Sequence, residues 1–549
     1  MNNAKISCLP TTPYEGQRPG TSGLRKKTKI FLQPRYLENF VQSVFNCVRK
    51  EELGDIRQQM LVIGGDGRFH NRTAIQIILR MAAANGFGRI LVGRGGLLST
   101  PAASAVIRRR AALGGLLLTA SHNPGGIQDD FGIKYNLRNG GPAPESITER
   151  IYEETRRIDQ YQTMAAPEVD IDKEGTTVLG ESLVTVIDPL SDYLELMHSL
   201  FDFNALQALF RGGFRLRFDA MHGVTGPYAR HIFESELEAG EGAVIHGQPL
   251  EDFGGRHPDP NQVHASELVS LLSGARAPDM GAACDGDGDR NMILGQNFFV
   301  SPGDSVAIIA ERARECIPGY RAGLAAVARS MPTSTALDRV ACRLGIQCYE
   351  TPTGWKYFGN LMDAGMCTIC GEESFGTGSD HVREKDGLWA VLSWLSILAC
   401  RKASVARTVQ EHWNQFGRSY FQRHDYEALE AGLAEDAVGR LRQQLPSLLG
   451  KAIASSVVQK VDDFSYTDPV DGSVTRNQGL RIILRDGSRI VFRLSGTGTE
   501  GATLRIYFER YRSNGRGEMA PTIGPMIHEI EGLLQLKRLL KREHPTIIA

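Results

Sequence analysis

This chain of 549 residues has no long apolar run, almost no net charge and few closely spaced cysteines. The longest nearly apolar run, residues 388–400, is too short to span a bilayer and predicts a buried helix. The formal net charge is −1, so no overall field would gather nucleic acid or an anionic membrane. Nine thinly spread cysteines indicate a reducing compartment, and residues 1–5 resemble neither a signal peptide nor a myristoylation site. We therefore expect a soluble cytoplasmic protein with no integral membrane association and no nucleic-acid partner.

Cysteine pairs that could hold zinc or form a redox couple are also scarce. Cys367 and Cys370 form a C-x-x-C motif, but no second pair lies at the spacing of a zinc ribbon. We interpret both as buried thiols in an apolar segment. Nucleotide signatures are missing too, since the chain has no Walker A motif and no kinase signature, so nothing indicates an ATP donor.

Short strands and helices alternate through the first third of the chain. Segments 60–63, 90–93 and 115–119 predict strands, and segments 74–84 and 101–112 have helical spacing, with Thr100 as the expected cap of the second. This alternation predicts a largely parallel sheet with helices on its faces. The pattern recurs later, with short strands predicted at 214–219, 280–284, 324–327, 347–350 and 368–370.

The last part of the chain has a different pattern. Segments 480–484 and 489–494 flank Asp486-Gly487, a type I′ turn signal, and predict a β-hairpin to which segment 504–509 adds a strand. At roughly 150 residues per domain the chain holds three or four domains. We expect three similar α/β units followed, after the helical segment 391–403, by an α+β domain.

The first loop with chemical potential, residues 119–126 (T-A-S-H-N-P-G-G), places Ser121 just after a predicted buried strand. Such a loop would expose a hydroxyl on a rigid support, and a serine is a nucleophile where a neighbour accepts its proton. A capping or turn serine is the commoner alternative. The G-x-S-x-G motif of serine hydrolases is absent here.

The second loop, D-G-D-G-D-R at residues 285–290, carries three alternating aspartates. In an extended segment alternate side chains point the same way, so Asp285, Asp287 and Asp289 should converge. Converging carboxylates repel one another unless a hard divalent cation neutralises them, and all-oxygen ligands favour Mg²⁺ or Ca²⁺. An EF-hand is excluded because Arg290 stands where the invariant glycine is required. A solvated acidic turn is a weaker alternative, because apolar segments flank the loop.

Two further loops have side chains suited to sugar hydroxyls. Residues 371–376 (G-E-E-S-F-G) continue to H-V-R-E-K at 381–385, and residues 351–356 (T-P-T-G-W-K) form another glycine-containing polar loop. Carboxylates and hydroxyls at this spacing match adjacent hydroxyl groups of a sugar, although either loop alone is compatible with an ordinary turn.

The fourth loop, residues 493–501 (R-L-S-G-T-G-T-E-G), is followed by Arg505. It contains a formal G-x-G-x-x-G, but the segment after it resembles a strand, and a dinucleotide fingerprint requires a helix. Serine, threonine, backbone amides and two arginines still predict a phosphate-binding nest, the alternative being an arginine-bearing hairpin turn. A serine, a metal loop, a hydroxyl-binding loop and a phosphate loop together indicate phosphoryl transfer on a sugar phosphate.

These loops resemble those of the α-D-phosphohexomutase superfamily, in particular its eukaryotic-type phosphoglucomutase and parafusin branch. The similarity covers nearly the whole chain and includes segments 19–25, 64–68, 119–126, 131–136, 285–290, 351–356, 371–387 and 493–505. It implies four domains around a central cleft: three similar α/β domains with mixed sheets and an α+β carboxy-terminal domain. We expect them at residues 1–192 (phosphoserine loop), 193–301 (metal loop), 302–405 (sugar-binding loop) and 406–549 (phosphate-binding loop).

The resemblance also implies roles for individual residues. Ser121 resembles the serine that carries the phosphoryl group, and with Asp285, Asp287 and Asp289 it would bind one Mg²⁺ per chain. His122, Lys134 and Lys385 match positions for proton transfer and charge stabilisation. The implied reaction interconverts glucose 1-phosphate and glucose 6-phosphate, with glucose 1,6-bisphosphate as intermediate and activator. The substrate-binding positions are Thr21, Arg25, Arg290, Thr353, Gly354, Glu372, Ser374, Arg493, Ser495, Thr497 and Arg505.

A second function class stays open at this point. Relatives in the parafusin branch imply a phosphoprotein with a scaffold or signalling role in regulated exocytosis, with or without mutase activity, and thus a peripheral association with vesicles. The nucleophile loop and the aspartates are complete, which favours an active enzyme. The sugar loop resembles the glucose type, which disfavours a phosphomannomutase or a bisphosphate synthase. We expect sugar phosphates as partners and a monomer or weak dimer.

Overall fold

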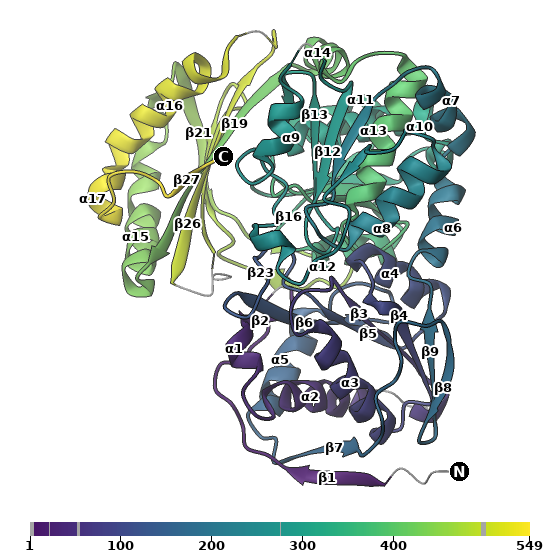
Figure 1. Cartoon of the computed structure of the whole chain (residues 1–549). Coiled ribbons are helices and arrows are strands. Elements are labelled where there is room, and N and C mark those ends of the chain that lie inside the picture. The colour runs from purple at the N-terminus through teal and green to yellow at the C-terminus, as the bar shows by residue number, and fades with distance from the viewer. Residues whose placement is uncertain (1–4, 21, 52–54, 275, 496–500, 516) are drawn as a thin grey trace.

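The computed structural model describes residues 5–20, 22–51, 55–274, 276–495, 501–515 and 517–549. The described chain builds four large β-sheets that follow one another in sequence (Figure 1). The first unit, purple, lies below the teal and green second and third units, and the yellow fourth unit lies beside them. The predicted fold class is confirmed, since the first three sheets are mixed and the fourth is antiparallel.

The first sheet has the strand order β2-β6-β5-β3-β4-β9-β8, and its central strands are parallel. In β3, Leu61 and Ile63 point into one hydrophobic cluster with the helices α2 and α3, whereas Val62 points into another with α4. A strand buried on both faces explains the continuous apolar run of its sequence. A separate antiparallel ribbon joins β1 (Ile6–Pro10) to β7 (Gln160–Met164). The strands of the first sheet are β2 (Leu24–Lys27), β3 (Met60–Gly65), β4 (Arg89–Leu97), β5 (Gly114–Leu118), β6 (Asp130–Leu137), β8 (Gly175–Leu179) and β9 (Ser182–Ile187), and its helices are α1 (Thr28–Phe31), α2 (Tyr36–Glu51), α3 (Asn71–Ala84), α4 (Thr100–Arg109) and α5 (Glu145–Thr155).

The second sheet has the order β11-β10-β12-β13-β14 and the third has β16-β15-β17-β18. Both share one hydrophobic cluster with α4 of the first unit. The second unit contains α6 (Ser191–Leu200), α7 (Phe203–Arg211), β10 (Leu216–Asp219), α8 (Thr225–Ala229), β11 (Val244–Ile245), α9 (Ser266–Leu271), β12 (Met280–Cys284), β13 (Asn291–Gly295) and β14 (Phe298–Val300). The third contains α10 (Pro302–Cys316), β15 (Ala326–Ser330), α11 (Ala336–Leu344), β16 (Gln347–Thr351), α12 (Trp355–Asp363), β17 (Ile369–Gly371), β18 (Thr377–Ser379), α13 (Gly387–Arg401) and α14 (Val405–Phe416).

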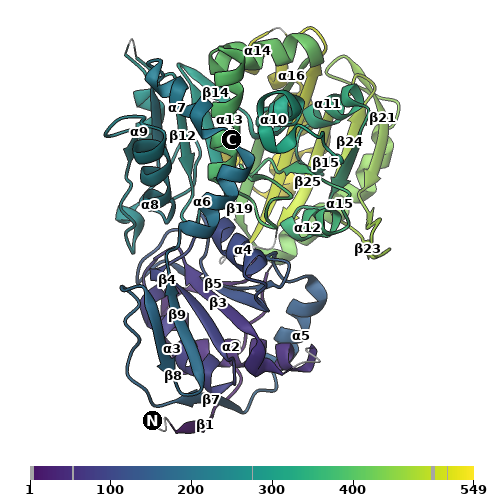
Figure 2. The ribbon, with the colours of Figure 1, turned by 90° about the vertical axis from the view of Figure 1, so that its right-hand side faces the viewer.

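The fourth sheet is antiparallel, with the order β20-β21-β24-β25-β26-β19-β27. Three helices, α15, α16 and α17, cover one of its faces (Figure 1). The third unit lies against the other face (Figure 2), where Val491 and Tyr507 pack against Met331. Its elements are β19 (Arg418–Leu429), α15 (Ala431–Gln444), β20 (Ala452–Ile453), β21 (Ser456–Asp463), β24 (Leu480–Leu484), β25 (Arg489–Ser495), β26 (Ala502–Arg512), α16 (Met519–Leu534), α17 (Leu536–Leu540) and β27 (Ile547–Ile548), with the small ribbon β22 (Tyr466–Thr467) and β23 (Val474–Thr475) beside it.

Two local predictions are corrected. The hairpin β24–β25 exists, but Gly487 has φ +86° while Asp486 keeps a negative φ, so the turn is not type I′. The amide of Gly487 donates to the carbonyl of Leu484, which fits a three-residue loop with glycine at the left-handed position. The cap of α4 is Ser99, whose hydroxyl accepts from the amide of Ala102, and Thr100 is the first helical residue.

The apolar segment 388–400 lies within α13, whose residues 387–398 are all buried. In the described part of the chain no single helix is long and apolar enough to cross a membrane; α13 and α14 pass that test only as a pair bent by 83°. Cys367 and Cys370 are buried free thiols, as predicted.

Candidate active site

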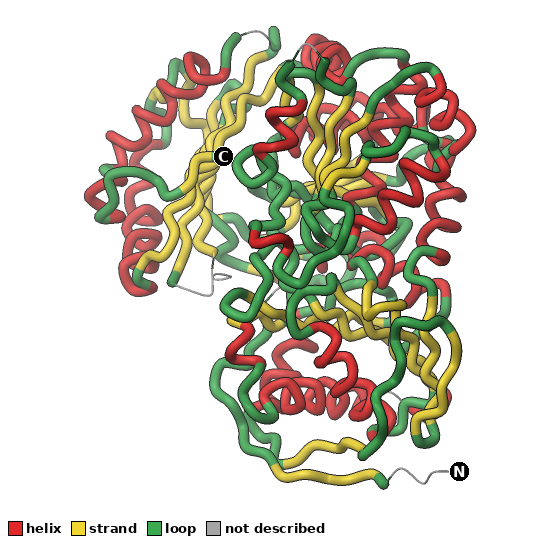
Figure 3. Tube along the Cα trace, in the orientation of Figure 1, coloured by secondary structure: helices red, strands yellow, loops and turns green. Residues whose placement is uncertain are grey.

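Loops gather in the middle of the molecule, between the first unit and the units above it (Figure 3). One of them follows β5 and carries Ser121, which has the positive φ of +54°. The Ser121 Oγ donates a 2.8 Å hydrogen bond to Asp285 Oδ2, from the loop after β12. Contrary to the expected exposure of this hydroxyl, Ser121 is only 1 % exposed, because loops of the second unit cover it. A residue other than glycine in this left-handed region of φ costs about 1–3 kcal/mol of conformational strain, so neighbouring groups must hold the backbone in place.

The groups that hold this backbone are buried beneath it. The amide of Ser121 donates to Thr119 Oγ1 at 2.7 Å, and Thr119 Oγ1 donates in turn to Asp66 Oδ2 at 2.6 Å. Arg68, which is paired with Asp66, donates from Nη2 to the carbonyl of Ser121 at 2.9 Å. Both ends of the strained residue are therefore fixed before any ligand binds.

The three aspartates do converge, but on a turn rather than on an extended segment. Gly288 has φ +80° and its amide donates to the carbonyl of Asp285, so the loop folds back on itself. One carboxylate oxygen from each of Asp285, Asp287 and Asp289 lies within 4.8 Å of the others, and all three side chains are buried. Burial raises the pKa of Asp285 well above its usual value, and the negative charges of the other two aspartates raise it further.

This cluster fits a divalent cation. Asp287 Oδ1 and Asp289 Oδ1 are buried and find no hydrogen-bond partner among the described residues. Buried carboxylate oxygens without partners are costly, and a hard cation with oxygen ligands satisfies them. Ser121 Oγ lies at the edge of the same cluster, so the predicted metal ligands are brought together.

Two lysines place positive charge beside the aspartates. Lys385 Nζ lies 3.0 Å from Asp289 Oδ2, and Lys134 Nζ lies 2.8 Å from Glu384 Oε1. Burial alone would lower the pKa of Lys385, but the carboxylates of Asp289, Glu372 and Glu384 together outweigh burial and the pKa is raised. Burial raises the pKa of Asp287, yet Lys134, a hydrogen bond from Thr100 and Lys385 outweigh that effect and lower it.

His122, Arg25 and Arg290 complete the surroundings of Ser121. His122 Nδ1 lies 3.4 Å from Ser121 Oγ. Burial, followed by the charges of Arg290 and Arg25, holds the pKa of His122 well below its usual value, so its imidazole is neutral at pH 7. The Nε atoms of Arg25 and Arg290 are buried without a hydrogen-bond partner in the described chain, which leaves donors free for an anionic ligand.

The predicted sugar loops meet each other and the metal loop. The amide of Gly354 donates to Glu372 Oε1 at 3.0 Å, and Gly354 has φ +129°, a conformation that favours glycine. Thr353 Oγ1 is buried without a described partner, and burial raises the pKa of Glu372. The loop that holds Ser374 lies beside the metal loop, because the backbones of Arg290 and Gly376 form an isolated antiparallel β-bridge.

Arg493 and Arg505 form a second group on the fourth sheet. They are register partners across β25 and β26, and Ser495 is paired with Thr503 two residues further along. Alternate residues of a strand lie on the same face of a sheet, so Arg493 and Arg505 lie on the face that carries Val491 and Tyr507. This is the face of the fourth sheet that packs against the third unit. Arg505 Nε lies 3.6 Å from Asp425 Oδ2, and Asp425 also pairs with Arg423. Thr21 and Thr497 lie outside the described residues.

Sequence reasoning missed several supporting side chains. Thr100 Oγ1 donates to Asp287 Oδ2 at 2.7 Å, and Glu384 accepts from both Lys134 and Asn136. Asp259 lies 3.6 Å from Arg290. Thr100 could have been found from its position after the strand β4, where loop residues face the ligand edge of an α/β sheet.

Comparison with known proteins agrees with this geometry. Residues 16–162, 191–297 and 302–416 match the families described as phosphoglucomutase/phosphomannomutase, alpha/beta/alpha domains I, II and III. Residues 418–546 match the phosphoglucomutase-1 C-terminal domain. The chain belongs to the phosphoglucomutase family. The exact domain boundaries predicted from the sequence stay a prediction.

Individual members of the phosphoglucomutase family align over the full chain. A phosphoglucomutase of Rhizobium radiobacter is 55 % identical over 99 % of this chain and 100 % of its own length. A probable cytoplasmic phosphoglucomutase of Arabidopsis thaliana is 51 % identical over 99 % of both chains. The crystal structure of pp63/parafusin from Paramecium, an exocytosis-sensitive phosphoprotein in its open form, has a TM-score of 0.92 at 47 % identity over 99 % of both chains.

Proposed function

We propose that this protein is a phosphoglucomutase that interconverts glucose 1-phosphate and glucose 6-phosphate through a phosphorylated Ser121 and glucose 1,6-bisphosphate. The observation that carries the proposal is the 2.8 Å contact of Ser121 Oγ with Asp285 inside a cluster of three buried carboxylates. A phosphoryl group stored on Ser121 accounts for a site without nucleotide motifs. Sugar phosphates are the proposed ligands.

In the proposed first step, the phosphoryl group moves from Ser121 to the free hydroxyl of the sugar phosphate. The bond from phosphorus to Ser121 Oγ breaks, a bond to the sugar oxygen forms, and the proton of the sugar hydroxyl ends on Ser121 Oγ. Lys134, Lys385, Arg25 and Arg290 supply positive charge around the phosphoryl oxygens, where preorganised charges stabilise a transition state. In the return step, the Ser121 hydroxyl accepts a phosphoryl group and loses its proton. The neutral imidazole of His122, whose Nδ1 lies 3.4 Å from Ser121 Oγ, is placed to take that proton.

The proposed cation is one Mg²⁺ held by Asp285, Asp287, Asp289 and an oxygen of the phosphorylated Ser121. When bound, it would neutralise charge on the phosphoryl oxygens. The identity of the ion rests on the donor set, which is all oxygen and is the type that hard cations prefer.

The remaining residues would hold the sugar and its second phosphate. Glu372, Ser374, Thr353 and the backbone of Gly354 are proposed to bind sugar hydroxyls. Arg493, Ser495, Thr497 and Arg505 are proposed to bind the phosphate that does not react, and Thr21 is proposed as a further substrate contact. The roles of Thr497 and Thr21 stay predictions. The intermediate must turn round before its other phosphate returns to Ser121, so a grip that accepts either phosphate keeps it from escaping.

A cytoplasmic location is proposed from the cytoplasmic relatives, although other relatives of similar identity are chloroplastic. The alternative of a scaffold in exocytosis is not favoured, because the curated relatives at 51–55 % identity are named phosphoglucomutases.

The test is a coupled assay of glucose 6-phosphate formation from glucose 1-phosphate, with and without added glucose 1,6-bisphosphate. Wild-type protein should turn over and be stimulated by the bisphosphate. Ser121→Ala should be inactive with an unchanged melting temperature. Ser270→Ala serves as a matched serine control, because Ser270 is an exposed residue of α9 whose hydroxyl donates to the carbonyl of Ser266. Equal activity of wild type and Ser121→Ala would contradict the proposal.

A further inference from the structure

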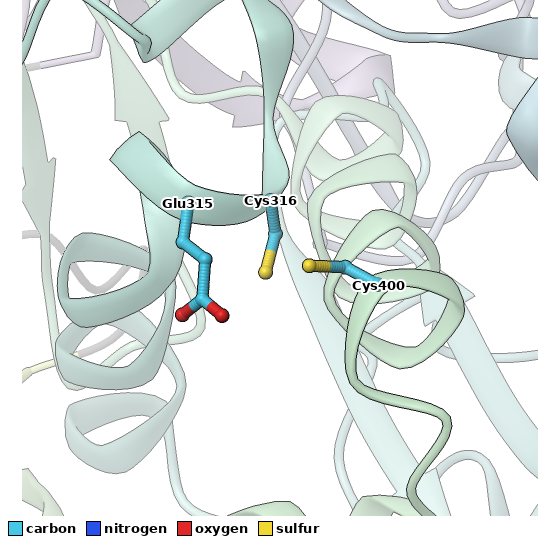
Figure 4. Close-up of side chains that lie close together, drawn as sticks. All are labelled: Glu315, Cys316 and Cys400. Carbon is cyan, nitrogen blue, oxygen red and sulfur yellow. The ribbon is translucent and has the colours of Figure 1, made fainter.

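Two cysteines and a glutamate meet far from the candidate active site, where two helices of the third unit end. Cys316 is the last residue of α10, Glu315 precedes it, and Cys400 is the next-to-last residue of α13. One ligand atom from each of the three lies within 4.8 Å of the other two. Figure 4 shows the two sulfur atoms pointing toward one another, with the carboxylate of Glu315 beside Cys316.

We propose that Glu315, Cys316 and Cys400 form a binding site for a thiophilic divalent cation of the Zn²⁺ type. Two thiolates and a carboxylate supply three ligands of a tetrahedral site, and water supplies the fourth. Bond lengths of zinc to sulfur and oxygen place such ligand atoms about 3.4–3.8 Å apart, so these three need only small side-chain adjustments. Cys400 and Glu315 are exposed, so an ion can enter from solvent.

The carboxyl ends of two helices favour a cation at this cluster. The carboxyl ends of α10 and α13 both lie at the cluster, and the negative end of a helix dipole stabilises positive charge. Glu315 contacts Arg312 and Arg401, each at 3.4 Å, a loose distance that leaves its oxygens able to bind a metal. Both arginines have further carboxylate partners: Arg312 lies 2.7 Å from Glu311, and Arg401 lies 3.4 Å from Glu411. Arg407 also pairs with Glu411, at 2.9 Å, so three guanidinium groups balance the three carboxylates. The attraction for a cation therefore comes from the helix ends and from the thiolates that form when the metal binds.

A disulfide is the alternative for Cys316 and Cys400, both of which are free cysteines in the structure. Forming a disulfide would remove the two thiol protons together with two electrons, so it needs an oxidant. A metal ion displaces these protons directly: two metal–sulfur bonds form, and the two S–H protons go to solvent with no change of oxidation state.

The cluster is remote from the proposed chemistry. The helix α13 starts two residues after Lys385, and Cys400 lies thirteen residues beyond that start. At 1.5 Å per residue the separation along the helix is about 20 Å. Binding would tie together the ends of α10 and α13, which pack against each other in the core of the third unit.

The experiment uses Co²⁺ as a spectroscopic probe on the full chain, reduced beforehand and held in excess Mg²⁺ so that the aspartate cluster is saturated. The expected result is a near-ultraviolet thiolate-to-cobalt absorption band that saturates at one equivalent and disappears when Zn²⁺ displaces the probe. Mutating a residue that only supports a metal ligand lowers metal affinity by about 10–100-fold. Because Cys316→Ser and Cys400→Ser each remove a ligand, each should lower the Co²⁺ affinity by at least about a hundredfold and abolish or halve the band. Glu315→Gln should weaken binding by about tenfold and keep the band.

Cys342→Ser is the matched control, because Cys342 is an exposed thiol on α11 outside the cluster, and it should leave the band unchanged. Mutase activity in Mg²⁺ should be the same for all of these variants. A missing band, or a band that survives both Cys316→Ser and Cys400→Ser, would overturn the proposal; Cys367 and Cys370 would then be the candidate ligands. A mass lower by two hydrogens after isolation in air, mapped to a Cys316–Cys400 peptide, would instead establish a disulfide.

Discussion

Replacing Arg505 by alanine tests the proposed grip on the distal phosphate. Arg505 lies on β26 beside Arg493 of β25, and its side chain is 26 % exposed. Its Nε has no hydrogen-bond partner among the described residues and lies 3.6 Å from Asp425, so the guanidinium has donors to spare for a phosphate. Asp425 keeps Arg423 as a partner at 2.9 Å, so the substitution leaves no unpaired buried carboxylate and the fold should hold.

The magnitude follows from the strength of the lost bond. A hydrogen bond to a charged group contributes about 1.5–3 kcal/mol, which corresponds to a loss of roughly tenfold to over a hundredfold in kcat/KM. Arg505→Lys should fall between wild type and alanine, because lysine keeps the charge but lacks the planar fork. Arg505→Ala should also need more glucose 1,6-bisphosphate for full activity, since the intermediate loses an anchor while it turns.

The assay is steady-state formation of glucose 6-phosphate at several concentrations of glucose 1-phosphate and of the bisphosphate. Arg442→Ala is the control, because Arg442 of α15 pairs with Asp463 on the helix-covered side of the fourth unit, away from Arg493 and Arg505. If Arg505→Ala and Arg442→Ala have the same KM and the same bisphosphate requirement as wild type, Arg505 does not bind the substrate.

Two further changes probe the rest of the site, and a third probes the stability of the fourth unit. Asp287→Asn should reduce the rate by at least about a hundredfold and abolish the response to Mg²⁺ after chelation, because one converging ligand loses its charge; full activity after exhaustive chelation would count against a metal. Thr100→Val should raise the Mg²⁺ concentration for half-maximal activity by about 10–100-fold with little change at saturation, because Thr100 orients Asp287. Burial alone would raise the pKa of Glu509, but the charges of Arg489 and Arg339 outweigh burial and lower this pKa to about 2. The carboxylate therefore contributes about 3 kcal/mol to the free energy of unfolding above pH 4.5, and this contribution fades as the pH falls toward 2. Urea unfolding should therefore show Glu509→Gln less stable than wild type at pH 7, with a smaller difference at pH 3.

Residues that lie in one loop could be found from the sequence. The aspartates of residues 285–289 share a short loop after an apolar strand, and Ser121 follows another, so strand prediction alone placed both at a sheet edge. The strands at 280–284 and 480–484 coincide with β12 and β24. The predicted conformation of the aspartate loop and the predicted exposure of Ser121 were wrong. The aspartates converge through a left-handed Gly288, and Ser121 is buried by loops from another unit.

Pairings across the chain could not be predicted from spacing. Lys134 and Glu384 are 250 residues apart, and Thr100 and Asp287 are 187 residues apart. Such contacts depend on how the units pack, which neither helical periodicity nor strand alternation encodes. Cys316 and Cys400 illustrate the same limit, because their meeting depends on where α10 and α13 end and not on any motif.

The most direct measurement of the central claim is intact-mass analysis of the purified protein, followed by peptide mapping. The account predicts one added phosphate at Ser121, lost on incubation with glucose 1-phosphate as the bisphosphate appears in solution, and regained on addition of glucose 1,6-bisphosphate. Ser121→Ala should carry none. An active enzyme that stays unphosphorylated throughout, or one whose phosphate maps to another residue and exchanges with substrate, would contradict the account.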